Sequence, residues 1–195
     1  LILDGIIQLT ERDNIGYHEM IAHVPMLAVG NPKRVLIVGG GDGGSLQQVL
    51  RYPSVEQALV CELDQRVVDL SREHFAFFGD PWADPRATLL VRDAFGFLEE
   101  NPSQFDVIIS DTTDPIGMAE RLFSNEFYKL MVRALVPGGH GDVPVSGSGH
   151  GCRGAGGLPA AARAGACARG APVPVGVRFP GRRRVGRGGR GTKWG

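Results

Sequence analysis

The stretch that decides the fold is Val35-Leu36-Ile37-Val38-Gly39-Gly40-Gly41-Asp42-Gly43-Gly44. Four consecutive large apolar residues are typical of a β-strand that is buried on both faces. The glycines that follow predict a loop whose backbone adopts positive φ angles or lets a ligand approach closely. Because nucleotide-binding α/β proteins hold their ligand where such a strand ends, we expect a cofactor site here.

Gly39, Gly41 and Gly44 have the G-x-G-x-x-G spacing of dinucleotide-binding loops. Asp42 argues against a dinucleotide, because its carboxylate would face the pyrophosphate, so the loop is expected to meet a cation. Glu62 follows the next predicted strand, where an acidic residue binds ribose hydroxyls in nucleotide-binding sheets. A nucleoside whose far end carries an amine or a sulfonium suits both carboxylates, which indicates S-adenosylmethionine chemistry or a relative of it. The alternative is that Asp42 only caps a helix and Glu62 only ends a strand.

From Lys33 onward the sequence alternates between predicted strands and predicted helices. Repeated βα units predict a parallel sheet with helices on both faces, so the expected fold class is α/β with a Rossmann-like sheet. In such sheets ligands bind beyond the carboxyl ends of the strands. The predicted strands are 35–38, 57–61, 87–91 and 105–110, and the predicted helices are 44–51, 64–75, 94–100 and 124–135.

Carboxylates recur where these predicted strands end. The four successive ends carry Asp42, then Glu62 and Asp64, then Asp93, then Asp111 and Asp114. Any one of these acids is more often a helix cap or a solvated loop residue than a ligand, so the inference rests on their coincidence. Burying so much like charge is costly without a cationic ligand. The sequence therefore predicts cationic substrates at this edge of the sheet.

The N-terminal part predicts a hairpin and a helix. Two apolar runs, 1–3 and 6–9, flank the turn signal Asp4-Gly5, which indicates the last hairpin of a small β element. A helix is predicted from Gly16 to Val29. Its expected apolar face consists of Met20, Ile21, Val24 and Leu27.

Charge divides the chain near residue 140. The 195 residues have no net charge, but residues 1–140 carry a balance of −9 and residues 141–195 a balance of +9. Gly, Ala, Arg and Pro fill 38 of the last 55 positions, without an apolar period. Such a segment cannot bury enough apolar surface to fold, so we predict that residues 140–195 are disordered or arise from a shifted reading frame. A basic tail that binds nucleic acid through Arg182-Arg183-Arg184 is the alternative.

Several other classes of site are not predicted. The three cysteines, Cys61, Cys152 and Cys167, have neither metal-site nor disulfide-framework spacing, so no metal is expected. The sequence contains neither a signal peptide nor a run of about eighteen apolar residues, so we expect a cytoplasmic protein without membrane association. The first residue is Leu rather than Met, so we expect that the beginning is missing.

Five motifs follow one another along the first 139 residues. They are Tyr17-His18-Glu19-Met20, Gly39-Gly40-Gly41-Asp42-Gly43-Gly44, Cys61-Glu62-Leu63-Asp64, Asp84-Pro85-Arg86 and Ile109-Ser110-Asp111-Thr112-Thr113-Asp114-Pro115-Ile116-Gly117. Together they resemble the spermidine synthase (polyamine aminopropyltransferase) family. The resemblance implies a sheet of the S-adenosylmethionine-dependent methyltransferase type and a homodimer or homotetramer. No further strand is legible after Gly139, so we expect a sheet truncated at its C-terminal end.

The resemblance implies transfer of an aminopropyl group from decarboxylated S-adenosylmethionine, a co-substrate, to putrescine, giving spermidine and methylthioadenosine without a prosthetic group. The implied donor-binding residues are Gly39, Gly41, Asp42 (the amine of the aminopropyl chain), Glu62 (the ribose), and Asp93 with Ala94 (the adenine edge). The implied acceptor-site residues are Asp111 as catalytic base, Asp114 for an amine of the acceptor, and Tyr17 and His18 along the polyamine channel. A carboxylate base suits this chemistry, because putrescine must lose a proton from one nitrogen before it can attack.

We therefore expect three units: residues 1–14 end a β-hairpin element, residues 15–139 form an incomplete catalytic domain, and residues 140–195 form the tail. Two other functions stay open. One is an amine N-methyltransferase on the same scaffold, and the other is an inactive binding protein whose basic tail contacts nucleic acid. A dehydrogenase fits least well, because Asp42 opposes the pyrophosphate of its cofactor. The acceptor could also be cadaverine, agmatine or a longer polyamine. If the sheet is unfinished, its edges are exposed, and whether the chain is active is then not decided by the sequence.

Overall fold

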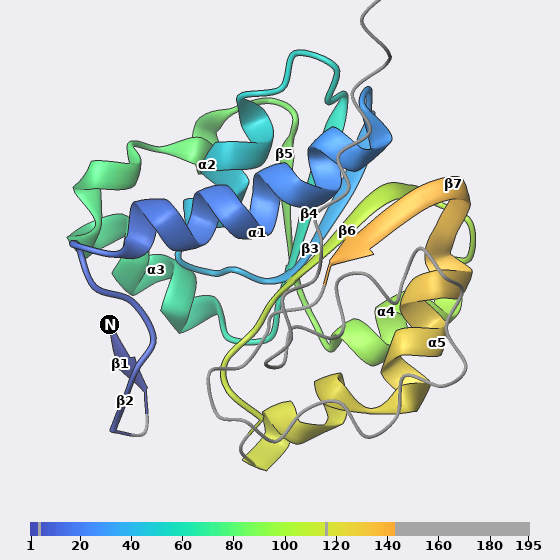
Figure 1. The fold of residues 1–195 in the computed structure, drawn as a ribbon. Helices are drawn as coiled ribbons and strands as arrows, with labels where there is room; N and C mark the ends of the chain where they lie inside the picture. The colour runs from blue at the N-terminus through green and yellow to red at the C-terminus, as the bar shows by residue number, and fades with distance from the viewer. Residues whose placement is uncertain (4, 116, 143–195) are drawn as a thin grey trace, which may run out of the picture.

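The apolar run 35–38 lies in the central strand of a five-stranded sheet (Figure 1). The structure is a computed structural model that describes residues 1–3, 5–115 and 117–142. The strands of this sheet are β3 (Arg34–Gly39), β4 (Gln57–Glu62), β5 (Ala87–Val91), β6 (Phe105–Asp111) and β7 (Leu135–Asp142). Their order is β5-β4-β3-β6-β7, and all neighbours pair in parallel. The predicted parallel α/β sheet is therefore confirmed.

Helices cover both faces of this sheet (Figure 1). The helices are α1 (Asn14–Val29), α2 (Gly44–Leu50), α3 (Gln65–His74), α4 (Ala94–Glu100) and α5 (Asn125–Ala134), with 3₁₀ turns η1 (Ala76–Phe78), η2 (Pro81–Ala83) and η3 (Gly117–Phe123). Ile37 packs in one core with residues of α1 and α2, whereas Leu36 packs in a second core with residues of α4 and α5. Because side chains alternate along a strand, a strand between two helical layers must be apolar at every position.

The order of the strands reverses between β3 and β6. From β3 the chain continues outward through β4 to β5, and it then returns to the other side of β3 to form β6 and β7. In the register of these two central strands, Gly39 is paired with Asp111. Ligands of open α/β sheets bind at such a switch point, beyond the carboxyl ends of the strands. The sheet thus brings the glycine loop and the last acidic motif together.

Three helices begin at side-chain caps. The side chains of Asp64, Asp93 and Ser124 accept hydrogen bonds from Arg66 N, Phe95 N and Phe127 N at the starts of α3, α4 and α5. These bonds satisfy backbone N–H groups that have no partner within the helix. Asp64 and Asp93 therefore act as helix caps, which is the alternative to a ligand-binding role for an acid at the end of a strand.

The buried face of α1 differs from the predicted one. Met20, Val24 and Leu27 are exposed to 65%, 49% and 70%, and Ile21 alone of the predicted face is buried. The buried residues of α1 are Asn14, His18, Ile21, Ala22, Pro25 and Met26. Because apolar residues occur all round this helix, their period cannot identify the face that packs against α2, β6 and β7.

A second difference concerns the end of the described chain. The catalytic domain is expected to end at residue 139, but the structure continues as β7, which pairs His140 with Val107 and Asp142 with Ile109. The expected boundary at residue 139 therefore lies inside a strand. A Cβ atom at Gly139 would lie 2.9 Å from the carbonyl oxygen of Asp106, so glycine is needed for the close approach of the strands. Strand pairing here depends on main-chain hydrogen bonds rather than on a side-chain pattern.

The expected N-terminal hairpin is present as β1 (Ile2–Leu3) and β2 (Ile6–Ile7), which pair in antiparallel fashion. Asp4 of its turn lies outside the described residues. The same holds for residues 143–195, so the expectations for the tail, including Arg182-Arg183-Arg184, Cys152 and Cys167, stay predictions. Within the described residues, no helix is both long and apolar enough to cross a membrane.

Candidate active site

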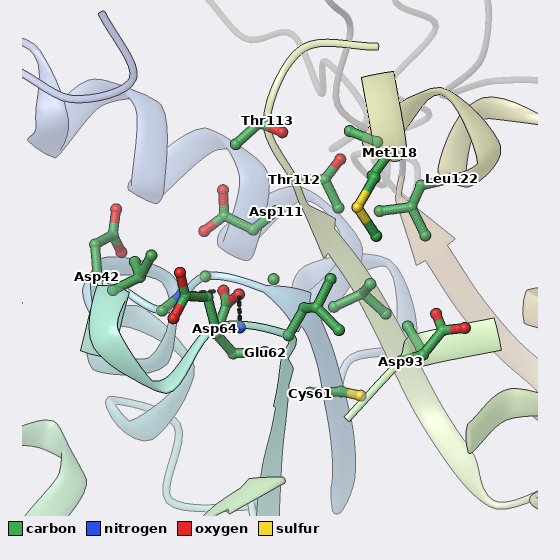
Figure 2. A pocket seen from close by; sticks show the side chains of 18 of the residues that line it. Asp42, Cys61, Glu62, Asp64, Asp93, Asp111, Thr112, Thr113, Met118 and Leu122 are labelled. Atoms are coloured by element: carbon green, nitrogen blue, oxygen red, sulfur yellow. Dashed lines mark hydrogen bonds between the residues drawn. The ribbon is translucent and has the colours of Figure 1, made fainter. Parts of the chain in front are cut away.

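A cavity of about 590 Å³ opens at the carboxyl edge of the sheet, at the switch point (Figure 2). Eight of the ten predicted site residues line it: Tyr17, Gly39, Gly41, Asp42, Glu62, Asp93, Ala94 and Asp111. His18 and Asp114 do not belong to the lining. Residues that are up to 94 positions apart thus meet around one cavity, which supports the interpretation of the strand-end acids as a group.

Asp111 ends β6 and is held from two sides. The phenol oxygen of Tyr17 donates a 2.7 Å hydrogen bond to Oδ1 of Asp111, and the hydroxyl of Ser45 donates a 2.6 Å hydrogen bond to Oδ2. The main chain is fixed as well, because Gly40 N donates to the carbonyl oxygen of Asp111 over 2.8 Å. The carboxylate consequently has a defined orientation at the cavity wall.

The surroundings of Asp111 raise the pKa of its carboxyl group from 3.8 to about 6. Burial contributes most, because it disfavours the charged form, and the negative charge of Asp42 adds to the increase. His18, Ser45 and Tyr17 act in the opposite direction. A carboxylate with a pKa near 6 is largely ionised at neutral pH and is still a better base than an ordinary aspartate, which suits proton abstraction.

The glycine loop packs closely against Asp111. Gly39 has a φ of 76°, and a Cβ atom on it would lie 2.1 Å from the carbonyl oxygen of Asp111. A side chain at this position is therefore excluded both by backbone conformation and by space. The loop then turns through Asp42, whose Oδ1 accepts a 2.8 Å hydrogen bond from Gly44 N. This turn places the second oxygen of Asp42 toward α1.

His18 packs against the glycine loop and does not belong to the lining of this cavity. Its side chain is only 1% exposed, and its Nε2 lies 3.3 Å from Oδ2 of Asp42. Burial alone would lower the pKa of His18, but the neighbouring charges of Asp42 and Asp111 outweigh burial and raise it. The ring also packs against Gly44, where a Cβ atom would lie 2.3 Å from it. The resemblance implies that His18 lines a polyamine channel, and this role stays a prediction; the structure places the His18 ring against Asp42 and Gly44.

Glu62 ends β4 opposite the loop. Its two carboxylate oxygens accept hydrogen bonds from Gly41 N (3.2 Å) and Asp64 N (3.0 Å). Burial raises the pKa of Glu62, although these backbone donors counteract the increase. In Figure 2, Glu62 and Asp64 lie side by side, between Asp42 and Cys61. The arrangement leaves a fixed acceptor on the cavity wall, as binding of sugar hydroxyls requires.

The far end of the cavity combines apolar and charged side chains. Met118 and Leu122 from η3 lie on one wall in Figure 2, across from Asp93. The guanidinium of Arg121 lies 4.5 Å from the ring centre of Phe95 and 4.0 Å from Oδ2 of Asp93. A space lined by apolar side chains, with polar groups at its edge, can accept an aromatic base.

Sequence reasoning assigned no role to several residues of this site. Ser45 contacts Asp111, and the side chains that complete the far end are Phe95, Thr112, Met118, Arg121 and Leu122. The only available signal for Ser45 was its place directly after the glycine loop. Asp114 is half-buried. Burial is the main cause of the raised pKa of Tyr17, and the negative charge of Asp114 adds a small part to the increase. Ile116 of the same motif lies outside the described residues.

The acidic groups of the site can hold a cation. Within the described residues, His18, Asp42 and Asp111 offer ligand atoms that all lie within 4.8 Å of one another. Two carboxylates at this distance repel each other, and a cation between them relieves the repulsion. Ammonium groups are as suitable for this purpose as a metal ion, because they also donate hydrogen bonds.

Comparison with known proteins gives the same family on sequence and on structure. Residues 14–140 match the family model described as Spermine/spermidine synthase domain. Spermidine synthase 1 of Pisum sativum is 51% identical over 140 residues, which are 71% of this chain and 42% of the relative. The spermidine synthase of Dictyostelium discoideum is 46% identical over 139 residues, which are 71% of this chain and 49% of the relative.

Two solved structures agree with these relatives. A crystal structure of spermidine synthase in complex with the transition state analogue AdoDATO aligns with a TM-score of 0.67 and 45% identity, over 69% of this chain and 46% of that chain. The crystal structure of the Thermotoga maritima spermidine synthase aligns with a TM-score of 0.62 and 42% identity, over 69% and 44%. This chain spans less than half the length of the curated relatives given above. Since the family match extends over more than half of the chain and includes the motifs that build the cavity, the chain belongs to the spermine/spermidine synthase family.

Proposed function

We propose that this chain is an aminopropyltransferase, which moves the aminopropyl group of decarboxylated S-adenosylmethionine to putrescine and releases methylthioadenosine. The observation that carries the proposal is the Asp111 carboxylate, oriented by two hydroxyl donors at the wall of an acidic cavity. Its raised pKa suits a general base that acts near neutral pH. The family membership supports the same reaction.

In this reaction Asp111 takes a proton from one ammonium group of the diamine. The freed nitrogen lone pair forms a bond to the aminopropyl carbon next to the sulfonium, and the carbon–sulfur bond breaks with its electrons on sulfur. The product nitrogen keeps two hydrogens and a positive charge, and the proton stays on Asp111 until it is released. General-base help of this kind contributes about 10²–10⁴-fold to a rate.

For the donor, we assign Asp42 to the amine of the aminopropyl chain and Glu62 to the ribose hydroxyls. The half-buried position of Glu62 on the cavity wall and its two backbone donors support this role, because the fixed carboxylate can accept from both hydroxyls. Asp93 and Ala94 begin α4 at the far end of the cavity, which suits contact with the adenine edge. Gly39 and Gly41 let the donor approach the backbone closely.

For the acceptor, we assign Tyr17 to the cavity wall beside the base and Asp114 to the second ammonium group. Putrescine carries two positive charges, so a second carboxylate near Asp111 would align the diamine for attack. His18 would act indirectly, by holding Asp42 from below. We propose that the cluster of His18, Asp42 and Asp111 binds ammonium groups rather than a metal ion. We also expect the chain to self-associate, which sedimentation would measure.

The test is incubation of the purified full chain with putrescine and decarboxylated S-adenosylmethionine, followed by mass spectrometry of spermidine and methylthioadenosine. We expect both products in equal amounts, and a loss of about 10²–10⁴-fold in the Asp111→Asn variant. Intact S-adenosylmethionine in place of the decarboxylated donor should give neither aminopropyl nor methyl transfer. A folded chain that forms no methylthioadenosine would overturn the proposal.

A further inference from the structure

Ser45 contacts the proposed base without being part of the cavity wall. Its hydroxyl donates to Oδ2 of Asp111 across 66 positions of sequence, and its side chain is 0% exposed. It is the second residue of α2, directly after the glycine loop. A fully buried hydroxyl in this place cannot bind substrate, so its bond acts only on the carboxylate.

The two oxygens of Asp111 have different surroundings. Oδ2 accepts from the buried Ser45 and lies against the glycine loop, where a Cβ atom on Gly40 would be 3.2 Å away. Oδ1 accepts from Tyr17, which is 42% exposed and lines the cavity. Protein atoms therefore occupy the side of Oδ2, whereas Oδ1 lies on the side from which a substrate arrives.

We propose that Ser45 is a positioning residue, which fixes Oδ2 of Asp111 against the glycine loop and leaves Oδ1 as the atom that accepts the substrate proton. This inference rests on the proposed function. In the proton-transfer step, the N–H bond of the ammonium group breaks, its electrons stay on nitrogen, and an O–H bond forms at Oδ1. Without the Ser45 bond the carboxylate could rotate and exchange its oxygens, so fewer encounters would have the required alignment.

Ser45 also affects the charge of the base, because a donor hydrogen bond favours the ionised form. The groups that face Asp111 are Tyr17 and His18 from α1, Asp42 from the glycine loop and Ser45 from α2. Burial and Asp42 raise the pKa of Asp111, whereas the other three lower it. Removal of the Ser45 hydroxyl leaves the remaining groups in place, so the pKa of Asp111 should rise by about one unit.

The test measures the carboxyl carbon signal of Asp111 by NMR as a function of pH, in the full chain and in Ser45→Ala and Ser45→Thr variants. The Asp111→Asn variant identifies the signal by its absence. We expect the titration midpoint of Ser45→Ala to lie about one unit above that of the unsubstituted chain. Ser45→Thr keeps a hydroxyl and should restore the original midpoint. An unchanged midpoint in Ser45→Ala would overturn the proposal.

The pH dependence of aminopropyl transfer gives a second readout. The acid limb of kcat should move in Ser45→Ala by the same amount as the titration midpoint, while KM for the donor stays constant. If Ser45→Ala shows transfer activity but an unchanged titration midpoint of Asp111, the role of Ser45 is contradicted and the proposed function is not. A moved titration in a folded chain without any transfer would contradict the proposed function and leave the hydrogen-bonding role of Ser45 intact.

Discussion

The phenol oxygen of Tyr17 lies 2.7 Å from Oδ1 of Asp111, although the two residues are 94 positions apart in the sequence. This bond joins the first turns of α1 to the end of β6. The orientation of the acidic group therefore depends on how α1 docks on the sheet. It also places an aromatic ring at the cavity wall directly beside the carboxylate.

Tyr17→Phe is expected to slow transfer without removing the aromatic ring from the cavity wall. Loss of a donor to Oδ1 should raise the pKa of Asp111 above its present value of about 6, so the acid limb of the pH–rate profile should move to higher pH. We expect a fall of about tenfold in kcat, since a hydrogen bond to a charged group is lost. The measurement is aminopropyl transfer across the pH range. Tyr52→Phe is the control, because the Tyr52 hydroxyl contacts His23 instead, and a matching shift in that variant would contradict the argument.

Asp111→Asn is expected to stabilise the fold while it slows transfer by about 10²–10⁴-fold. The pKa of Asp111 is about 6 in the folded chain and 3.8 for an ordinary aspartate, so the folded state binds the proton more tightly. The ionised carboxylate consequently costs stability above pH 6, by at most about 3 kcal/mol. This cost disappears as the pH falls from 6 toward 4. An uncharged side chain of the same shape avoids it.

Urea unfolding at several pH values tests whether Asp111→Asn raises the free energy of unfolding as expected. The gain of Asp111→Asn over the unsubstituted chain should be largest at neutral pH and should vanish near pH 4. Asp69→Asn, at an exposed position of α3, is the control and should change the free energy of unfolding by no more than about 0.5 kcal/mol. A gain that grows toward low pH would show that the pKa of Asp111 is lowered rather than raised.

The part of the site that was predicted from sequence is the part fixed by the sheet. Because β3, β4 and β6 are parallel, their carboxyl ends lie at one edge, and the acids that follow them must gather there. Asp42, Glu62 and Asp111 accordingly line one cavity. The alternation of strands and helices in the sequence indicates that the strands are parallel. The gathering of these acids at one edge could therefore be predicted without knowledge of side-chain packing.

The parts that were missed depend on contacts between distant segments. His18 is buried because Asp42 and Gly44 approach it from the other side, and no local pattern records that approach. In the sequence, Ser45 is only a polar residue at the start of a helix, and its contact with Asp111 exists only in the folded chain. Strand β7 contains glycines that local propensity assigns to a loop, and its pairing with β6 supplies the hydrogen bonds that outweigh this propensity.

Gly39→Ala is expected to unfold or severely destabilise the chain. The added Cβ atom would lie 2.1 Å from the carbonyl oxygen of Asp111, and the residue would have to keep a φ of 76°. A loss of more than about 2 kcal/mol follows, because backbone atoms cannot move aside easily. Gly79→Ala separates the two effects, since Gly79 has a φ of 66° but nothing within 4 Å of an added Cβ atom. Equal losses in urea unfolding would show that backbone strain alone accounts for the change.

Arg86→Lys is expected to lower stability without affecting the site. Nη2 of Arg86 donates to Leu50 O at 2.7 Å and to Asp84 Oδ2 at 2.8 Å, and its other nitrogens reach Asp84 Oδ1, Tyr52 O and Val55 O. These contacts join the end of α2 to the amino edge of the sheet, opposite the cavity.

A lysine has one nitrogen and cannot satisfy several acceptors in the fixed geometry of the guanidinium, so about 1–2 kcal/mol should be lost. Thermal unfolding measures this loss, and the NMR titration of Asp111 serves as the control. Although Asp84-Pro85-Arg86 is one of the motifs by which the family is recognised, its position implies a purely structural role. A changed midpoint for Asp111 in Arg86→Lys would instead connect the motif to the chemistry.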